Sequence, residues 1–310
     1  MAWIVAPYNV RAQSRRAVRV GILTAGGAVY HEALKQGLQE RGWIEGKNIH
    51  IFTRDAKGES DMLRRLAAEL IAAKPDAIFA STYLAVLAVT DQTASIPVVF
   101  AAISNPVGAG LVNSLSRPGG RLTGVASGTA PLAGKRLEIL KDAIPRLERV
   151  AALYDATGQG EAGFEELDQA AARLGISVIR IGVSGPPDLE RAFVNMRKQG
   201  ADAVLVPVTA RLFADRHNII KLAARDRLPA IYGISDIADE GGLIAYGPNY
   251  FESHRRAAHH LDRILRGARP GDLPVEEMMR LELVVNLRAA RAAAITFLPA
   301  LLARADRVIE

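Results

Sequence analysis

The stretch PVVFAAISNPVGAGLVNSLSRPGG, Pro97–Gly120, begins as an apolar strand and breaks into Ser104-Asn105-Pro106, where a plain turn would be enough. A similar stretch, RLPAIYGIS, Arg227–Ser235, again runs as a short apolar strand into small polar groups. The two are separated by about 130 residues, the size of one α/β domain. We therefore interpret the chain as two similar domains in tandem.

The two copies match element by element. The first has strands at 19–24, 48–53, 75–81 and 95–102 and helices at 30–41 and 61–73. The second has strands at 149–154, 176–181, 201–207 and 227–233 and helices at 163–174 and 188–199. Short apolar strands that alternate with amphipathic helices indicate parallel sheets covered on both faces. The sequence therefore predicts an α/β fold with two Rossmann-like lobes.

The chain continues well past the second copy, with a strand at 242–247, a helix at 250–266 and a strand at 280–286. A tail of this length can cross back to the first lobe and return, which gives several hinge segments instead of one linker. We expect a leader at 1–18, lobe 1 at 19–124 plus 246–275, and lobe 2 at 125–245 plus 276–310.

Composition excludes several classes of protein. The 310 residues include no cysteine, which excludes disulfides, thiolate nucleophiles and cysteine-based metal sites. The net charge is +6, but Lys and Arg are spread among acidic residues and form no basic run, so we expect no binding to nucleic acid. No apolar stretch reaches the roughly 18 residues of a membrane span.

Ligands bind beyond the carboxyl ends of strands in parallel sheets. The residues at those ends are hydroxyls, amides and aromatics, which suit an oriented small molecule. The candidate ligand-binding residues are Thr24, Ala25, Gly26, Ser81, Thr82, Tyr83, Ser104 and Asn105 in the first copy, and Tyr154, Asp155, Thr209, Tyr232, Asp236 and Tyr246 in and after the second.

Two features of this set admit other interpretations. Thr24–Gly27 could be a backbone nest for a ligand carboxylate, a nucleotide loop or a plain turn, and the dinucleotide Gly-x-Gly-x-x-Gly pattern is absent. Tyr83, Tyr154, Tyr232 and Tyr246 are four of the seven tyrosines. Tyrosines often cap sheets with the hydroxyl in water, but four at one edge favour at least two ligand contacts.

The pattern does not favour catalysis. Ser81, Thr82 and Ser104 lack a nucleophile elbow or an ordered base, and the histidines fit helix faces or strands. Asp155 and Asp236 could form a carboxylate pair, although the sequence does not fix their separation. The helix at 132–143, with Lys135 and Arg136, is interpreted as a solvated face. We expect no catalytic residue, no metal and no cofactor.

Several blocks together resemble a known family. They are Ile96–Leu111, Ser116–Gly120, Leu122–Gly124, Gly134–Glu138, Arg227–Tyr232, Gly241–Gly247 and Leu301–Asp306. In this order and spacing they look like the ABC transporter substrate-binding proteins typified by the tryptophan and aromatic amino acid binding lipoproteins. The resemblance covers roughly Arg19 to Glu310.

The resemblance implies a type I periplasmic-binding-protein fold, in which three hinge crossovers join the lobes and a ligand is captured between them. It implies a non-catalytic, periplasmic receptor that delivers a small polar or aromatic molecule, such as an amino acid, to ABC permease subunits of the inner membrane. We expect a monomer. Val10–Gln13 then looks like the end of a truncated signal peptide. The alternative is a two-lobe enzyme or a cytoplasmic ligand-sensing module.

One residue departs from the family pattern. Asn105 stands where relatives usually carry an Asp, whose charge could pair with a ligand ammonium. An amide offers only a hydrogen-bond donor and acceptor. Either the ligand lacks an amine, or Asp155 or Asp236 supplies the charge.

Overall fold

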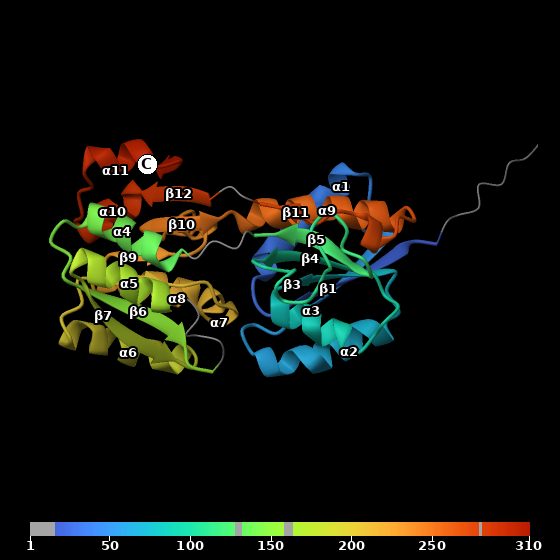
Figure 1. Cartoon of the computed structure of the whole chain (residues 1–310), viewed down its shortest axis with the longest axis horizontal. Coiled ribbons are helices and arrows are strands. Elements are labelled where there is room, and N and C mark those ends of the chain that lie inside the picture. The colour runs from blue at the N-terminus through green and yellow to red at the C-terminus, as the bar shows by residue number, and fades with distance from the viewer. Residues whose placement is uncertain (1–15, 128–131, 158–163, 279–280) are drawn as a thin grey trace, which may run out of the picture.

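The computed structural model describes residues 16–127, 132–157, 164–278 and 281–310. It consists of two lobes, each built on one β-sheet with helices on both faces (Figure 1). The predicted signal-peptide remnant at Val10–Gln13 lies outside the described residues.

Lobe 1 contains one sheet and the helices that cover it. Its strands are β1 (Val18–Thr24), β2 (Ile49–Asp55), β3 (Ala77–Ser81), β4 (Val98–Ile103), β5 (Leu122–Ala126) and β11 (Glu276–Glu277). Its helices are α1 (His31–Glu40), α2 (Leu63–Ala72), α3 (Tyr83–Thr90) and α9 (Tyr250–Leu265), with 3-10 turns η1 (Ala28–Tyr30), η2 (Ser60–Met62) and η4 (Pro270–Asp272).

Among the described residues, lobe 2 has more strands and more helices than lobe 1. Its strands are β6 (Arg149–Asp155), β7 (Ser177–Val183), β8 (Ala203–Val206), β9 (Ala230–Tyr232), β10 (Ile244–Pro248), β12 (Leu281–Asn286) and β13 (Arg307–Ile309). Its helices are α4 (Ala133–Ala143), α5 (Phe164–Leu174), α6 (Pro186–Lys198), α7 (Ala210–Ala214), α8 (Arg216–Arg225), α10 (Leu287–Ala293) and α11 (Pro299–Arg304), with the 3-10 turn η3 (Ser235–Ala238).

The two sheets share one strand order. Lobe 1 runs β2-β1-β3-β4-β5-β11 and lobe 2 runs β7-β6-β8-β9-β10-β12-β13, so the first five positions correspond. A shared contact accompanies the order, because the Asp76 carboxylate accepts from the backbone N–H of Arg19 at 2.7 Å and Asp202 accepts from that of Arg149 at 2.8 Å. The predicted duplication and α/β fold are confirmed. Between these strands, only β10 and β12 pair antiparallel.

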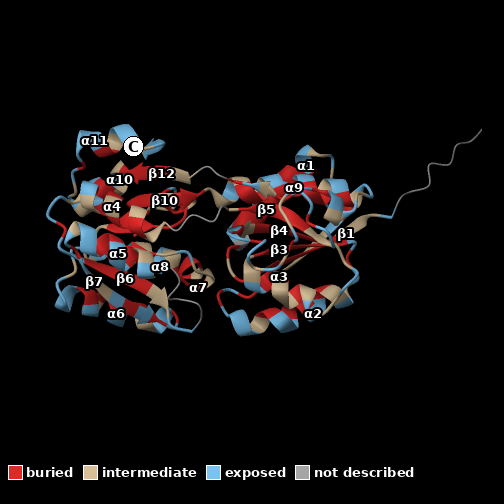
Figure 2. Cartoon of the chain, in the orientation of Figure 1, coloured by how far each residue is buried: buried red, intermediate tan, exposed pale blue. Residues whose placement is uncertain are grey.

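Each sheet is buried between two apolar layers (Figure 2). In lobe 1, α1 and α9 pack on one face around Phe79, and α2 and α3 pack on the other around Phe100. In lobe 2, α4 and α5 cover one face and α6 and α8 the other, around Phe193. This arrangement leaves the strand ends as the places where polar side chains can gather.

The chain passes between the lobes between β5 and α4, between β10 and α9, and between β11 and β12. The predicted boundaries differ slightly from this placement. Those at 124/125 and 245/246 would divide β5 and β10, and the boundary at 275/276 would move β11 out of lobe 1. Each predicted boundary lies two or three residues before the end of the strand that it divides or displaces.

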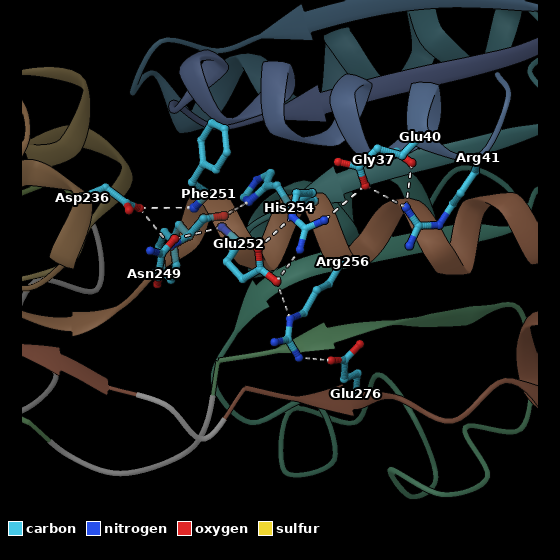
Figure 3. Close-up of polar contacts among 12 residues, drawn as sticks. Gly37, Glu40, Arg41, Asp236, Asn249, Phe251, Glu252, His254, Arg256 and Glu276 are labelled. Carbon is cyan, nitrogen blue, oxygen red and sulfur yellow. Dashed lines mark hydrogen bonds and ion pairs between the residues drawn. The ribbon is translucent and has the colours of Figure 1, made fainter. Parts of the chain in front are cut away.

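Helix α9 returns from lobe 2 and packs closely against α1. A Cβ on Gly37 would lie 2.5 Å from the carbonyl oxygen of Arg255 and 2.7 Å from the Cβ of Ala258, so only glycine fits this crossing. Glu252 accepts hydrogen bonds from Arg255 and Arg256, and those residues reach Glu40 of α1 and Glu276 of β11 respectively (Figure 3). Helix α9 is therefore fixed to both α1 and the edge of the sheet.

Within the described residues, no helix combines the length and apolar character needed to cross a membrane.

We predict that Gly37→Ala destabilises the protein, although alanine is the better helix former by about 1 kcal/mol. The added methyl overlaps backbone atoms of α9, and overpacking of this kind costs about 1–3 kcal/mol. Urea unfolding measures the free energy change. Gln36→Ala, on the exposed face of the same helix, is the control and should change stability little. A Gly37→Ala variant as stable as the control would contradict the close packing.

Candidate functional site

The loops after β1 and β2 of lobe 1 touch α7 of lobe 2. A Cβ on Gly26 would lie 3.0 Å from the carbonyl oxygen of Ala210, and one on Gly58 would lie 3.3 Å from the Cβ of Ala214. The carboxyl-end loops of one sheet therefore meet a helix that follows a carboxyl end of the other. This is the region where ligands bind in open α/β sheets.

Tyr30, at the start of α1, is inserted between the lobes. Its ring stacks on Phe213 of α7 with centroids 5.2 Å apart, and it lies 5.1 Å from the ring of His254 and 5.9 Å from that of Tyr250. Only 5% of Tyr30 is exposed, and its hydroxyl has no hydrogen-bond partner among the described residues. Burial, helped by the charge of Asp236, raises the pKa of this phenol far above its usual value. The ring thus contributes apolar contact across the junction.

Arg211 of α7 adds an ionic contact across the same junction. Its guanidinium lies 3.5 Å from the Asp155 carboxylate of its own lobe and 3.6 Å from the Glu59 carboxylate of lobe 1. The Arg211 side chain is only 9% exposed, so these charges interact with less screening than a surface pair. Contacts of both kinds hold the lobes together.

A third contact lies at the crossing from β10 to α9 (Figure 3). The carboxylate of Asp236, in η3 of lobe 2, accepts from the backbone N–H of Tyr250 at 2.9 Å and of Phe251 at 3.2 Å. These amides open α9, whose positive dipole end favours an anion. Burial outweighs the two bonds and raises the pKa of Asp236 to about 6.

The interpretation of the helix at 132–143 as a solvated face is wrong for Arg136, which is buried. The residue is only 6% exposed, and it donates from Nε to the carbonyl of Tyr246 at 2.9 Å and from Nη2 to that of Gly233 at 3.1 Å. Burial lowers the pKa of its guanidinium to about 10. Nothing in the sequence analysis indicated that a cation belongs to a buried face of α4.

The predicted residues at the ends of β1 and β3 form a buried, locally bonded group. The Ser81 hydroxyl donates to that of Thr24 at 2.9 Å, and Thr24 in turn donates to the carbonyl of Gly26. Ala25 is core, whereas Gly26 borders lobe 2. These residues shape the loop, and its backbone forms the surface toward lobe 2.

The next two strand ends carry strained backbone. Thr82 has a φ of 86° while its hydroxyl accepts from the N–H of Ala85 at the start of α3, and Tyr83 beside it is half-buried. Ala102 has a φ of 61°, just before the exposed Ser104 and Asn105. A non-glycine residue with a positive φ costs about 1–3 kcal/mol, and such residues concentrate at ligand sites. The Asn105 side-chain oxygen accepts from the N–H of Gly108 at 2.8 Å, which fixes the lip locally.

The predicted lobe 2 residues fall into two groups. Tyr154 is half-buried with its ring 5.7 Å from that of Phe164, Asp155 accepts from Thr157 and pairs with Arg211, and Thr209 caps α7. These three lie at the carboxyl edge, as does the half-buried Tyr246. Tyr232 differs, because it is 1% exposed in the lobe 2 core and lines a cavity of about 380 Å³ near the amino end of β10.

Sequence reasoning missed Tyr30, Arg136, Arg211 and Tyr250 as residues of this junction. Tyr250 begins α9 two residues after β10, and Tyr30 directly precedes α1 in the segment that follows β1, so both lie near strand ends, as the four predicted tyrosines do. The two arginines carry no such signal.

Among the described residues, no group of three or more histidine and carboxylate side chains is arranged to hold a metal ion.

Two buried histidines lie behind Tyr30. His254 is 1% exposed and its Nδ1 lies 2.8 Å from the Tyr250 carbonyl oxygen, and His31 is 4% exposed. The Nε2 atom of each has no hydrogen-bond partner among the described residues. Burial lowers the pKa of His254 to about 3 and that of His31 to about 4, so both are neutral in the folded protein near neutral pH.

Comparisons with known proteins agree with this architecture. The sequence profile of the ABC transporter substrate binding protein family matches residues 18–309. A curated relative, the tyrosine-binding protein of Clostridioides difficile (strain R20291), is 24% identical over 286 residues, which are 90% of this chain and 81% of that protein.

Solved structures show the same fold at low identity. A conserved domain protein from Vibrio cholerae has a TM-score of 0.81 at 24% identity, covering 94% of this chain and all of that one. The ABC domain in complex with L-Trp from Streptococcus pneumonia has a TM-score of 0.81 at 23% identity with the same coverage. A ligand-free, open substrate binding protein from Clostridium difficile has a TM-score of 0.63 at 22% identity, covering 95% of this chain and 99% of that one.

We predict that Tyr30→Ala shifts the protein toward a more open arrangement of the lobes. Loss of an aromatic contact worth about 0.5–1.5 kcal/mol changes the ratio of closed to open forms by up to about tenfold. Small-angle X-ray scattering should give a larger radius of gyration for ligand-free Tyr30→Ala than for the wild type. Tyr83→Ala, which removes a tyrosine of the same lobe that makes no ring contact with another described residue, is the control. An unchanged radius in Tyr30→Ala would count against its bridging role.

We predict that acidification from pH 6.5 toward 4 destabilises the protein through His31 and His254. The unfolded chain binds protons at both positions below about 6.5 and the folded chain does not, so stability falls by up to about 1.4 kcal/mol per pH unit for each histidine. Asp236 acts in the opposite direction below pH 6, because the folded state binds its proton first.

Chemical unfolding at several pH values isolates one histidine. His254→Asn keeps a donor near the Tyr250 carbonyl and should reduce the slope of stability against pH by close to one histidine's contribution. His259→Asn, exposed on the same helix, is the matched substitution with which the slope is compared. Equal slopes in His254→Asn and the wild type would disprove the assignment.

Proposed function

The chain belongs to the ABC transporter substrate-binding protein family, and we propose that it captures a small polar or aromatic molecule, an amino acid or a close relative, between its lobes. The observation that carries this proposal is the junction itself. Lobe 1 supplies Tyr30 and the loop at Gly26, and lobe 2 supplies Phe213 and Arg211. A molecule held there touches both lobes.

Such a molecule would act by shifting a population. A ligand that contacts both lobes binds the closed form better than the open form, and it stabilises closure by that difference in affinity. Three crossings of the chain restrict the lobes to hinge motion, because each crossing limits sliding and separation.

The chemistry of the edge supports an aromatic or amino acid ligand. Half-buried Tyr83, Tyr154 and Tyr246 lie at or beside carboxyl ends of strands, where they offer flat walls and hydroxyls. One relative is named a tyrosine-binding protein, and one structure of the same fold contains L-Trp. These facts favour aromatic amino acids as the first ligands to test.

The family fixes the broad setting, and its members are solute-binding proteins that act typically outside the cell or in the periplasm. For this chain we propose a periplasmic, monomeric, non-catalytic receptor that delivers its ligand to ABC permease subunits. The hydrogen bonds of Asp155 to Thr157 and of Asp236 to α9 support a structural use of both carboxylates over a catalytic one.

We predict that the protein binds at least one aromatic L-amino acid with one molecule per chain. A thermal-shift screen of the twenty amino acids, simple sugars and nucleosides, followed by titration calorimetry of every hit, tests this. Binding at 100 times the dissociation constant should add about 2.7 kcal/mol to the stability of the folded state. Time-dependent conversion of the bound molecule, or no binding by any member of the screen, would overturn the proposal.

A further inference from the structure

Arg136 lies at the carboxyl edge of the lobe 2 sheet. It belongs to the first turn of α4, and its guanidinium carbon would be 3.3 Å from a Cβ on Gly233, the residue that follows β9. Val208, which follows β8, borders the same position and is 38% exposed. Arg136 therefore occupies the edge that, in our proposed function, faces the ligand.

Arg136 lacks a paired carboxylate within the part of the chain that the structure describes. It forms no ion pair with any described carboxylate, and its two hydrogen bonds go to neutral carbonyl oxygens. Glu166 is the acid that acts on it electrostatically, but both oxygens of Glu166 accept from the backbone N–H groups of Ala133 and Gly134 at 3.0 Å. Its other charged or titratable neighbours are the phenols of Tyr246 and Tyr250.

A buried cation without an anion is costly, and proteins ordinarily pair such a group. Arg211, at the same edge, shows the usual solution because it has Asp155 and Glu59 within 3.6 Å. No described residue pairs with Arg136 in this way. Its Nη1 has no acceptor among the described residues, so the guanidinium retains a donor for a further group.

We infer that Arg136 binds an anionic group of the ligand, so that the ligand of this protein is a carboxylate-bearing molecule. The inference rests on the proposed function, because it assigns a role within the same interlobe site. A carboxylate supplies the missing charge, and a charge-assisted hydrogen bond in a buried site is stronger than one in water.

The test pairs each ligand with its amide, which keeps the amino group and lacks the negative charge of the carboxylate. L-Tryptophan and L-tryptophanamide, L-tyrosine and L-tyrosinamide, and L-leucine and L-leucinamide are titrated into the wild type and into Arg136→Gln. The wild type should bind the acid of at least one pair about 100-fold more tightly than its amide, the factor that about 2.7 kcal/mol represents. In Arg136→Gln the acid should lose most of that advantage, and the acid and amide should bind within a few-fold of each other.

Two further variants separate recognition from structural damage. Arg136→Lys keeps a positive charge without the planar fork and should restore part of the preference for the acid. Lys135→Gln removes the neighbouring charge, which is paired with Glu138, and should leave the preference unchanged. A change in Arg136→Gln that weakens acid and amide equally would show a purely structural role and would overturn the inference.

The inference and the proposed function fail differently. A wild type that binds amides as tightly as acids, or that binds only uncharged molecules such as sugars, overturns the role of Arg136 and leaves solute capture standing. A wild type that binds nothing in these pairs or in the wider screen overturns the proposed function, and the inference falls with it.

Discussion

Parallel strand pairing is the constraint on which the rest of this structure depends. When strands pair in parallel, their carboxyl ends meet at one edge, and each connection must cross a face of the sheet as a helix or loop. The faces are then filled by apolar helices, so polar side chains gather at the ends of the strands. Because the chain contains this unit twice, two such edges are available, and the contacts of Tyr30 and Arg211 join them.

Much of this architecture could be predicted from the sequence, because it follows from local patterns. Strand and helix positions follow from apolar periodicity, and the pairing of copies follows from the return of Pro97 and its surroundings at Pro229. The antiparallel approach of β12 to β10 could not be predicted, since an apolar strand such as Leu281–Asn286 reads the same in either direction. The crossing points were imprecise because Gly124 and Gly247, which in sequence indicate breaks, lie inside β5 and β10.

The site was harder to predict than the fold. Position after a strand correctly brought Tyr154, Asp155 and Thr209 to the edge, but alternation within β9 placed Tyr232 in the core. The burial of Arg136 depends on carbonyls of Gly233 and Tyr246, which are about 100 residues away in sequence and carry no side-chain signal. The structure also bears on how a ligand ammonium could be bound. The amide oxygen of Asn105 accepts from Gly108, and the carboxylates of Asp155 and Asp236 accept from Thr157 and Tyr250. Recognition of a ligand's negative end is therefore better supported than recognition of an ammonium.

The late strands also determine when each lobe can be completed during synthesis. In chain order, α9 and β11 of lobe 1 follow β6 to β10 of lobe 2, and β12 and β13 of lobe 2 follow β11. A nascent chain released at Gly242 would lack β11 of the lobe 1 sheet and β10, β12 and β13 of the lobe 2 sheet, and Phe79 would lack the cover of α9. Long-range pairing of this kind slows folding and delays the burial of apolar surface. Neither lobe can therefore be completed by the part of the chain that precedes Gly242.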